Sequence, residues 1–178
     1  PGTCFGGLCL CLVNTGGSHA DLTDNYAAVS GEMRSIAEYF GKKVLREVDQ
    51  EEFYERLPEL RRSCGDRALL RAAHFFDEMA RVETVRKALE SSDSQTFLDN
   101  INASGDSSYM LLQNIYPEGS SMDQSLALGL MLSKKVLKGT GACRVHGGGF
   151  AGTIQSFVPD HKLDEYCAVM EQTFGPGS

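Results

Sequence analysis

Residues 141–152, with the sequence Gly-Ala-Cys-Arg-Val-His-Gly-Gly-Gly-Phe-Ala-Gly, are the most informative stretch of this chain. Three consecutive glycines stand between two short runs of β-prone residues, 143–146 and Thr153–Pro159. Glycine allows the backbone to adopt a positive φ or to approach another group closely. A glycine cluster within a strand pattern therefore predicts a bulge or a close-approach loop. On the glycines alone, a structural hairpin and a functional loop remain equally open.

The rest of the chain shows strand patterns near both ends and helical patterns between them. Leu8–Asn14 is a further apolar strand, and residues 44–48 are a short strand candidate. The longest helical pattern is Asp66–Glu90, where apolar residues recur at helical spacing. Other helices are expected from about residues 18–22 to Phe40, from Pro58, over 93–102, 107–115 and 121–137, and at the end of the chain with a buried face of Leu163, Cys167, Met170 and Phe174. We therefore expect an α+β fold, a two-layer sandwich of a small, mostly antiparallel sheet packed against a helical block.

The length of 178 residues suits one domain. Residues 1–7 are expected to be a linker or a ragged start, and residues 8–178 the domain itself. The last helix leads to no segment that could return to the sheet, so we expect the domain to be cut before a last strand. Asp49 with Glu52, and Ser121 with Gln124, predict capping boxes at two helix starts.

The composition excludes several classes of protein. Hydrophobic residues make up 42% of the chain and the formal net charge is −7, so a nucleic-acid surface is not expected. No apolar run approaches the roughly 20 residues that span a bilayer, and no positive segment precedes residues 8–13 as in a signal peptide. The six cysteines match neither a zinc framework nor a Cys-x-x-Cys pair, which indicates small core residues in a reducing, cytoplasmic environment.

Two familiar glycine motifs can be set aside. Gly147, Gly149 and Gly152 satisfy Gly-x-Gly-x-x-Gly, but a dinucleotide site requires a helix next, whereas a β-prone run follows here. The His-Gly-Gly-Gly sequence resembles an esterase oxyanion segment, but the chain contains no Gly-x-Ser-x-Gly nucleophile elbow. No Walker A sequence is present either.

Single histidines and aromatic residues give weaker signals. The four histidines, at positions 19, 74, 146 and 161, lack the spacing of metal ligands, so no metal site is expected. His146 alone adjoins the glycine loop. Tyr26 could be a core residue or could direct a polar tip into a cleft; periodicity alone favours the core.

Taken together, these residues resemble the C-terminal half of galactokinases, in the GHMP small-molecule kinase superfamily. Residues 144–152, Arg-Val-His-Gly-Gly-Gly-Phe-Ala-Gly, are similar to the third motif of the superfamily, which commonly reads Arg-Met-Thr-Gly-Gly-Gly-Phe-Gly-Gly in galactokinases. Residues 14–26, 44–48, 71–82 and 102–104 agree in the same order. The departures are Val145, His146 and Ala151, and the first two change polarity and bulk beside the loop.

The resemblance implies a fold, a reaction and two site elements. The fold would be the C-terminal domain of a GHMP kinase with a ferredoxin-like core. The full enzyme would transfer the γ-phosphate of ATP to the 1-hydroxyl of galactose, with Mg²⁺. Tyr26 matches the tyrosine that contacts the sugar, and Gly147, Gly148 and Gly149 match the loop at the phosphate site.

The resemblance also implies what this chain lacks. The sugar-binding motif, the phosphate loop and the catalytic aspartate of galactokinases belong to an N-terminal half that is not part of this sequence. We therefore expect no catalytic base, no metal ligand and no bound cofactor here, and no activity from this chain alone. The partners expected are galactose, ATP and the N-terminal half, without nucleic acid or membrane.

Three alternatives remain open from the sequence. The first is a related sugar kinase acting on N-acetylgalactosamine or another hexose. The second is a galactokinase-like sugar sensor without catalysis, and the third is a stand-alone ligand-binding module.

Overall fold

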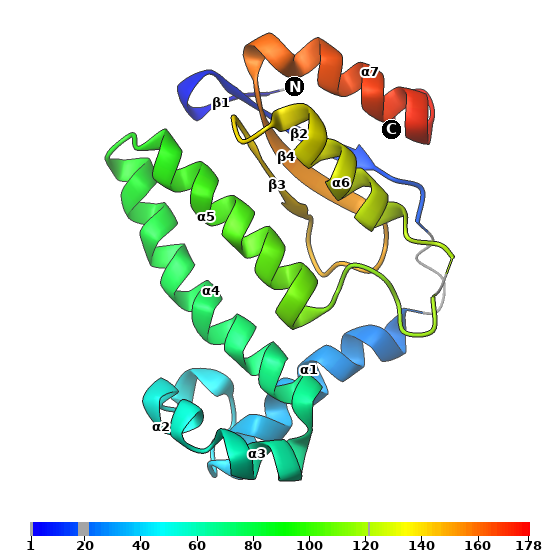
Figure 1. Ribbon diagram of the computed structural model, residues 1–178. Helices are drawn as coiled ribbons and strands as arrows, with labels where there is room; N and C mark the ends of the chain where they lie inside the picture. The colour runs from blue at the N-terminus through cyan, green and yellow to red at the C-terminus, as the bar shows by residue number, and fades with distance from the viewer. Residues whose placement is uncertain (1, 18–21, 121) are drawn as a thin grey trace.

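The structure is a computed structural model that describes residues 2–17, 22–120 and 122–178. A four-stranded sheet with the order β1-β2-β4-β3 combines segments from both ends of the chain (Figure 1). The strands are β1 (Gly2–Cys4), β2 (Leu8–Asn14), β3 (Ala142–Val145) and β4 (Thr153–Pro159). Every pairing is antiparallel. The expected α+β fold with a small antiparallel sheet is confirmed.

The longest pairing joins β2 to β4 from Leu8 opposite Pro159 to Asn14 opposite Thr153. Both strands have seven residues, and successive side chains along each strand point to opposite faces of the sheet. This pairing carries β4 and the glycine loop before it to the end of β2. The chain beyond Asn14 then runs beside that loop.

Helices cover both faces of the sheet. On one face, α6 (Ser125–Leu137) and α7 (Leu163–Phe174) pack on Val13, Ile154 and Val158. On the other face, Phe97 and Leu98 of α5 (Ser94–Ser107) contact a cluster that includes Leu8 and Ala142. Both clusters are buried apolar side chains, whose removal from water supplies the main driving force for this packing.

A second hydrophobic core lies away from the sheet, where α1 meets the first half of α4 (Figure 1). The helices around it are α1 (Thr23–Tyr39), α2 (Gln50–Glu55), α3 (Leu57–Cys64) and α4 (Asp66–Glu90). Ile36, Phe53, Leu60 and Ala72 are fully buried there. The Asp49 carboxylate accepts a hydrogen bond from the Glu52 N–H, which confirms that cap. No helix in the described ranges is long and apolar enough to cross a membrane.

Two segments differ from expectation: residues 1–7, at the start of the sheet, and residues 44–48, within the helical block. The expected linker at residues 1–7 contains β1 and a short 3₁₀ turn, η1 (Phe5–Gly7). Gly6 and Gly7 adopt positive φ where the chain reverses, and β1 pairs with β2 in antiparallel register. Residues 44–48 form a 3₁₀ turn, η2 (Leu45–Glu47), instead of a strand, because this segment lies on the second core, where the described chain offers no strand to pair with.

Helix ends and helix faces account for the other differences. Residues 93–115, expected as two helices, form α5 followed without a break by a π-helical turn, η3 (Ser108–Leu112). Gln124 precedes α6 without a side-chain cap, and its expected partner Ser121 lies outside the described residues, as do positions 18–21 before α1. On α7 the expected buried Cys167 is exposed, because the helix directs the large Tyr166 inward beside Met170. A last 3₁₀ turn, η4 (Asp160–Lys162), joins β4 to α7.

Candidate functional site

The glycine loop, residues 146–152, connects β3 to β4 at the end of the sheet nearest α1. Gly147 and Gly149 have φ of +65° and +83°, and Phe150 has φ of +61°. L side chains rarely adopt this left-handed region, so the backbone of the loop is strained at Phe150. The glycines therefore allow a backbone path that other residues would resist. Strain of this kind is held only where the surrounding structure fixes it.

Tyr26, in the first turns of α1, is the first residue that fixes the loop. Its hydroxyl donates a hydrogen bond to the Gly149 carbonyl oxygen at 2.8 Å. Its ring meets Phe150 edge to face, with 5.4 Å between centroids. The ring also lies so close to Gly148 that a Cβ there would be 2.8 Å from a ring carbon. Tyr26 is 39% exposed, so the core interpretation suggested by periodicity is wrong, and its polar tip reaches the loop.

Asn114 is the second such residue, and the sequence analysis did not single it out. Its side-chain Nδ2 donates to the Gly148 carbonyl oxygen at 3.1 Å, and its backbone carbonyl oxygen accepts a hydrogen bond from the Phe150 N–H at 2.7 Å. The side chain is 1% exposed. The sequence shows only a polar residue near the end of the helical pattern of residues 107–115, and nothing in it points to glycines more than thirty positions further on.

The base of the loop is held by the segment after β2. The Thr15 N–H and hydroxyl donate to the Gly152 carbonyl oxygen at 2.6 and 2.9 Å. A Cβ on Gly17 would lie 2.1 Å from the Ala151 carbonyl oxygen, so these two backbones touch directly. The sequence Asn-Thr-Gly-Gly at residues 14–17 thus serves as a packing surface for the loop.

These contacts use the carbonyl groups of Gly148 and Gly149 and leave the amides of the three glycines unused. The Gly148 and Gly149 carbonyls bond to Asn114 and Tyr26. Within the residues that the structure describes, the N–H groups of Gly147, Gly148 and Gly149 donate to no protein acceptor. Consecutive amides near left-handed backbone form a concavity that suits an anion. Phosphate oxygens are the anionic acceptors that fit such a group of donors.

His146 lies at the entrance of the loop and does not take part in this arrangement. Its side chain is exposed, and its Nδ1 is 2.9 Å from the Gln155 Oε1 on the neighbouring strand. Its N–H donates to the Thr153 carbonyl and so completes the strand pairing. The substitution of histidine for the usual threonine therefore changes the rim of the loop and leaves the glycine backbone in place.

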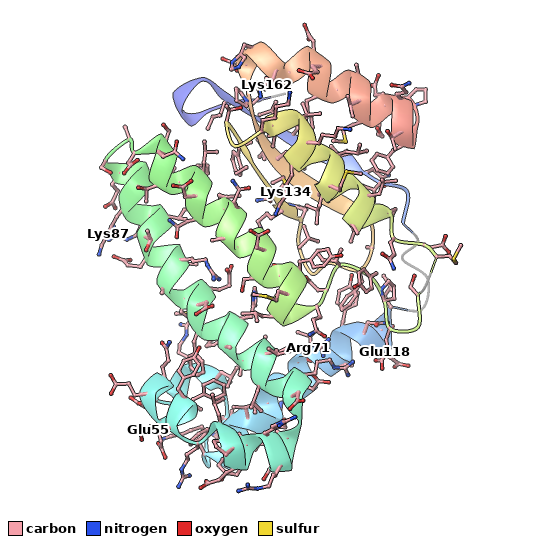
Figure 2. The ribbon with its side chains drawn as sticks, viewed as in Figure 1. Glu55, Arg71, Lys87, Glu118, Lys134 and Lys162 are labelled. Atoms are coloured by element: carbon pink, nitrogen blue, oxygen red, sulfur yellow. The ribbon has the colours of Figure 1, made fainter. Side chains whose placement is uncertain are left out.

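A buried ion pair supports the segment that carries Asn114. The Arg71 guanidinium, projecting from α4 toward α1 (Figure 2), binds the Glu32 carboxylate at 2.8 Å and donates to the Leu112 carbonyl at 3.1 Å. Burial lowers the pKa of Arg71, and the adjacent Glu32 partly offsets this. Through these two contacts the guanidinium connects α1 to Leu112, the last residue of η3.

The described residues contain no group of three His, Cys, Asp or Glu side chains arranged to hold a metal ion. What the loop offers is a set of backbone donors beside a tyrosine hydroxyl. That combination can bind an anion and a neutral hydroxyl group side by side.

Comparison with known proteins agrees with this picture, although no family model matches the chain. A galactokinase from Glaesserella parasuis is 30% identical over 158 residues, which are 89% of this chain and 39% of that protein. A galactokinase from Actinobacillus pleuropneumoniae is 28% identical over 168 residues, 94% of this chain and 42% of that protein. The chain thus spans about two fifths of the length of these curated relatives.

A solved structure shows the same fold. The galactokinase of Lactococcus lactis, complexed with galactose, superposes with a TM-score of 0.77 at 19% identity, covering 96% of this chain and 42% of that one. The resemblance to galactokinases found in the sequence is confirmed over most of the chain. The fold is therefore that of part of a galactokinase.

Proposed function

We propose that this chain is the C-terminal domain of a galactokinase, whose full form transfers the γ-phosphate of ATP to the 1-hydroxyl of galactose. One observation supports this most directly. Tyr26 and the glycine loop, which the resemblance assigns to the sugar and to the phosphate, are joined by a hydrogen bond of 2.8 Å. A sugar hydroxyl and a phosphoryl group must lie side by side for transfer, and these two elements do.

The part of this domain in the reaction is positioning. Phosphoryl transfer depends on orientation and on electrostatic stabilisation of the phosphoryl oxygens. The amides of Gly147, Gly148 and Gly149 carry no side chains that would crowd those oxygens, and they have no protein acceptor in the described structure. Tyr26 uses its only proton on Gly149, so toward a sugar it offers lone pairs and accepts a hydrogen bond from a sugar hydroxyl.

The catalytic base and the Mg²⁺ ligands lie, in this proposal, in the N-terminal half of the full protein. The resemblance assigns the catalytic aspartate, the sugar-binding motif and the phosphate loop to that half, and the described residues contain no group of three His, Cys, Asp or Glu side chains arranged to hold a metal. This chain alone is therefore expected to be inactive. Its surface beside the loop would complete the active site only when the other half is present.

The experiment is galactose-dependent ADP release by this chain, by a separately produced N-terminal half, and by their mixture. Activity only in the mixture supports a galactokinase whose cleft needs both halves. Activity of this chain alone would refute the assignment of the base to the other half. If the halves are shown to associate but their mixture releases no ADP, a sugar sensor is favoured. Repeating the assay with a panel of sugars that includes N-acetylgalactosamine would identify a related sugar kinase.

Tyr26→Phe tests the sugar contact in the full enzyme. The loss of the hydroxyl removes both the bond to Gly149 and the proposed acceptor for the sugar. We expect the KM for galactose to rise by about tenfold, the value of one hydrogen bond to a neutral group. An unchanged KM and kcat would remove Tyr26 from the site.

A further inference from the structure

We propose that Asn114 is a positioning residue for the glycine loop, which holds the Gly148–Gly149 peptide in the orientation that directs its N–H toward a phosphoryl group. This inference rests on the proposed kinase function and assigns a role to a residue that the resemblance does not include. Asn114 touches neither substrate in this proposal. It acts through the backbone of the loop.

The first support is the contact itself. The Asn114 Nδ2 donates to the Gly148 carbonyl at 3.1 Å, and the side chain is 1% exposed. A Cβ on Gly149 would lie 2.5 Å from that nitrogen and 2.2 Å from the Asn114 backbone oxygen. Glycine at position 149 is therefore what allows Asn114 to lie directly beneath the loop. If Asn114 only filled space beneath the loop, an apolar side chain would serve as well.

The second support is the backbone that presents Asn114. It follows the π-helical turn η3, and Gln113 before it is left-handed with φ of +57°. π-helical turns are rare and occur mostly at functional sites. The Gln113 N–H bonds to the Ser108 carbonyl, and Arg71 holds the Leu112 carbonyl. An uncommon backbone, held at two carbonyls, thus places one buried amide against the loop.

The third support is the geometry of the peptide. In a trans peptide the C=O and N–H groups point in opposite directions. With the Gly148 carbonyl bound to Asn114, the Gly149 N–H points away from it, and it has no acceptor in the described structure. Because both residues are glycines, no side chain of their own opposes rotation of this peptide. Rotation would present a carbonyl oxygen to the phosphoryl group in place of a donor.

The test uses the full-length protein that contains this chain, with Asn114→Asp as the informative variant. Aspartate keeps the size of asparagine, but its ionised carboxylate cannot donate to the Gly148 carbonyl. Its protonated form can, and burial raises the pKa of such a carboxyl group toward the assay range. We therefore expect kcat about tenfold or more below wild type at about pH 8, and recovery to within about threefold near pH 6.

Matched variants separate positioning from packing. Ser108→Ala removes a different buried polar group, from the π-helical turn before Asn114. The Ser108 hydroxyl has no partner among the described residues. This variant should keep wild-type kcat and its pH profile. Asn114→Ala should lose kcat at every pH, with the KM for galactose within about threefold of wild type, because the Tyr26 contact remains.

The outcomes are distinct. A wild-type protein without galactose-dependent ADP release refutes the proposed function, and this inference with it. In an active wild type, Asn114→Asp or Asn114→Ala with unchanged kcat overturns the role of Asn114 alone. A loss that does not depend on pH in Asn114→Asp, or that Ser108→Ala shares, would show a packing role only. If Asn114→Ala fails to fold, the pH profile of the isosteric Asn114→Asp decides.

Discussion

Alanine substitutions along the glycine loop should destabilise the chain by very different amounts. Gly147 and Gly149 both adopt positive φ, so alanine at either position carries the cost of the left-handed region. They differ in their surroundings. A Cβ on Gly147 meets no atom within 4 Å, whereas a Cβ on Gly149 lies 2.2 Å from the Asn114 backbone oxygen. The pair thus separates backbone strain from close approach within one loop.

The magnitudes follow from these geometries. The left-handed backbone region destabilises the folded state by about 1–2 kcal/mol for an L residue. Replacing glycine by alanine also reduces the conformational freedom of the unfolded chain, which offsets about 0.4–1 kcal/mol of that loss. Gly147→Ala should therefore cost about 1 kcal/mol. Gly149→Ala adds overpacking of about 1–3 kcal/mol and displaces Asn114 from its hydrogen bond, worth about 1 kcal/mol, which brings the cost to about 3–5 kcal/mol.

Thermal unfolding of the purified chain measures this difference. For a domain of this size, 1 kcal/mol corresponds to about 2–4 °C in Tm. Gly147→Ala should lower Tm by about 2–4 °C, and Gly149→Ala by about 6–20 °C. Gly148→Ala should fall between them, because the atoms nearest to its Cβ would be those of the Tyr26 ring, which is partly exposed and can move. Equal shifts for Gly147→Ala and Gly149→Ala would refute the close approach of Asn114 to the loop.

Three further predictions concern buried polar groups outside the loop. Glu32→Gln leaves the Arg71 guanidinium, 4% exposed, without a charged partner and should cost about 2–3 kcal/mol, measured by urea unfolding. Burial lowers the pKa of His74 below its unfolded value of about 6.5, so the unfolded chain binds a proton at a higher pH than the folded chain does. Tm should therefore fall as pH drops from about 7.5 to 5.5. His74→Gln should make Tm less dependent on pH over this range. Tyr166→Phe removes a buried hydroxyl that donates to Ser156 at 2.7 Å and should lower stability by about 1–2 kcal/mol, with an isosteric core as the reason for so modest a loss.

The parts of the fold that the sequence predicted well are those governed by local periodicity and burial. Leu8–Asn14 and Asp66–Glu90 have the expected bounds because apolar residues at strand or helical spacing are a signal contained within the element itself. Residues 44–48 show the limit of this reasoning. Their β-branched residues suit a strand, but a strand needs a neighbour to pair with, and the chain places this segment on a helical core.

The candidate site was predicted only as far as its two separate elements. The sequence marked Tyr26 and Gly147–Gly149 through their resemblance to a motif, whereas their contact depends on how α1 packs beside the β3–β4 connection. Asn114 could not be found in this way. Its position results from a π-helical turn, and the helical pattern of residues 107–115 contains no signal that distinguishes i+4 from i+5 hydrogen bonding.

The hydrogen bond between Tyr26 and Gly149 links the two sides of the proposed active site. A tyrosine hydroxyl has one proton, and here that proton is committed to the loop carbonyl. A sugar hydroxyl that donates to the Tyr26 oxygen would polarise that O–H and strengthen its bond to Gly149. Sugar binding would then hold the second loop carbonyl more firmly, while Asn114 holds the first one. In the proposed kinase, the Gly149 N–H between these carbonyls would thus be best oriented for a phosphoryl group when the acceptor sugar is in place, which would favour transfer to the sugar over loss of the phosphoryl group to water.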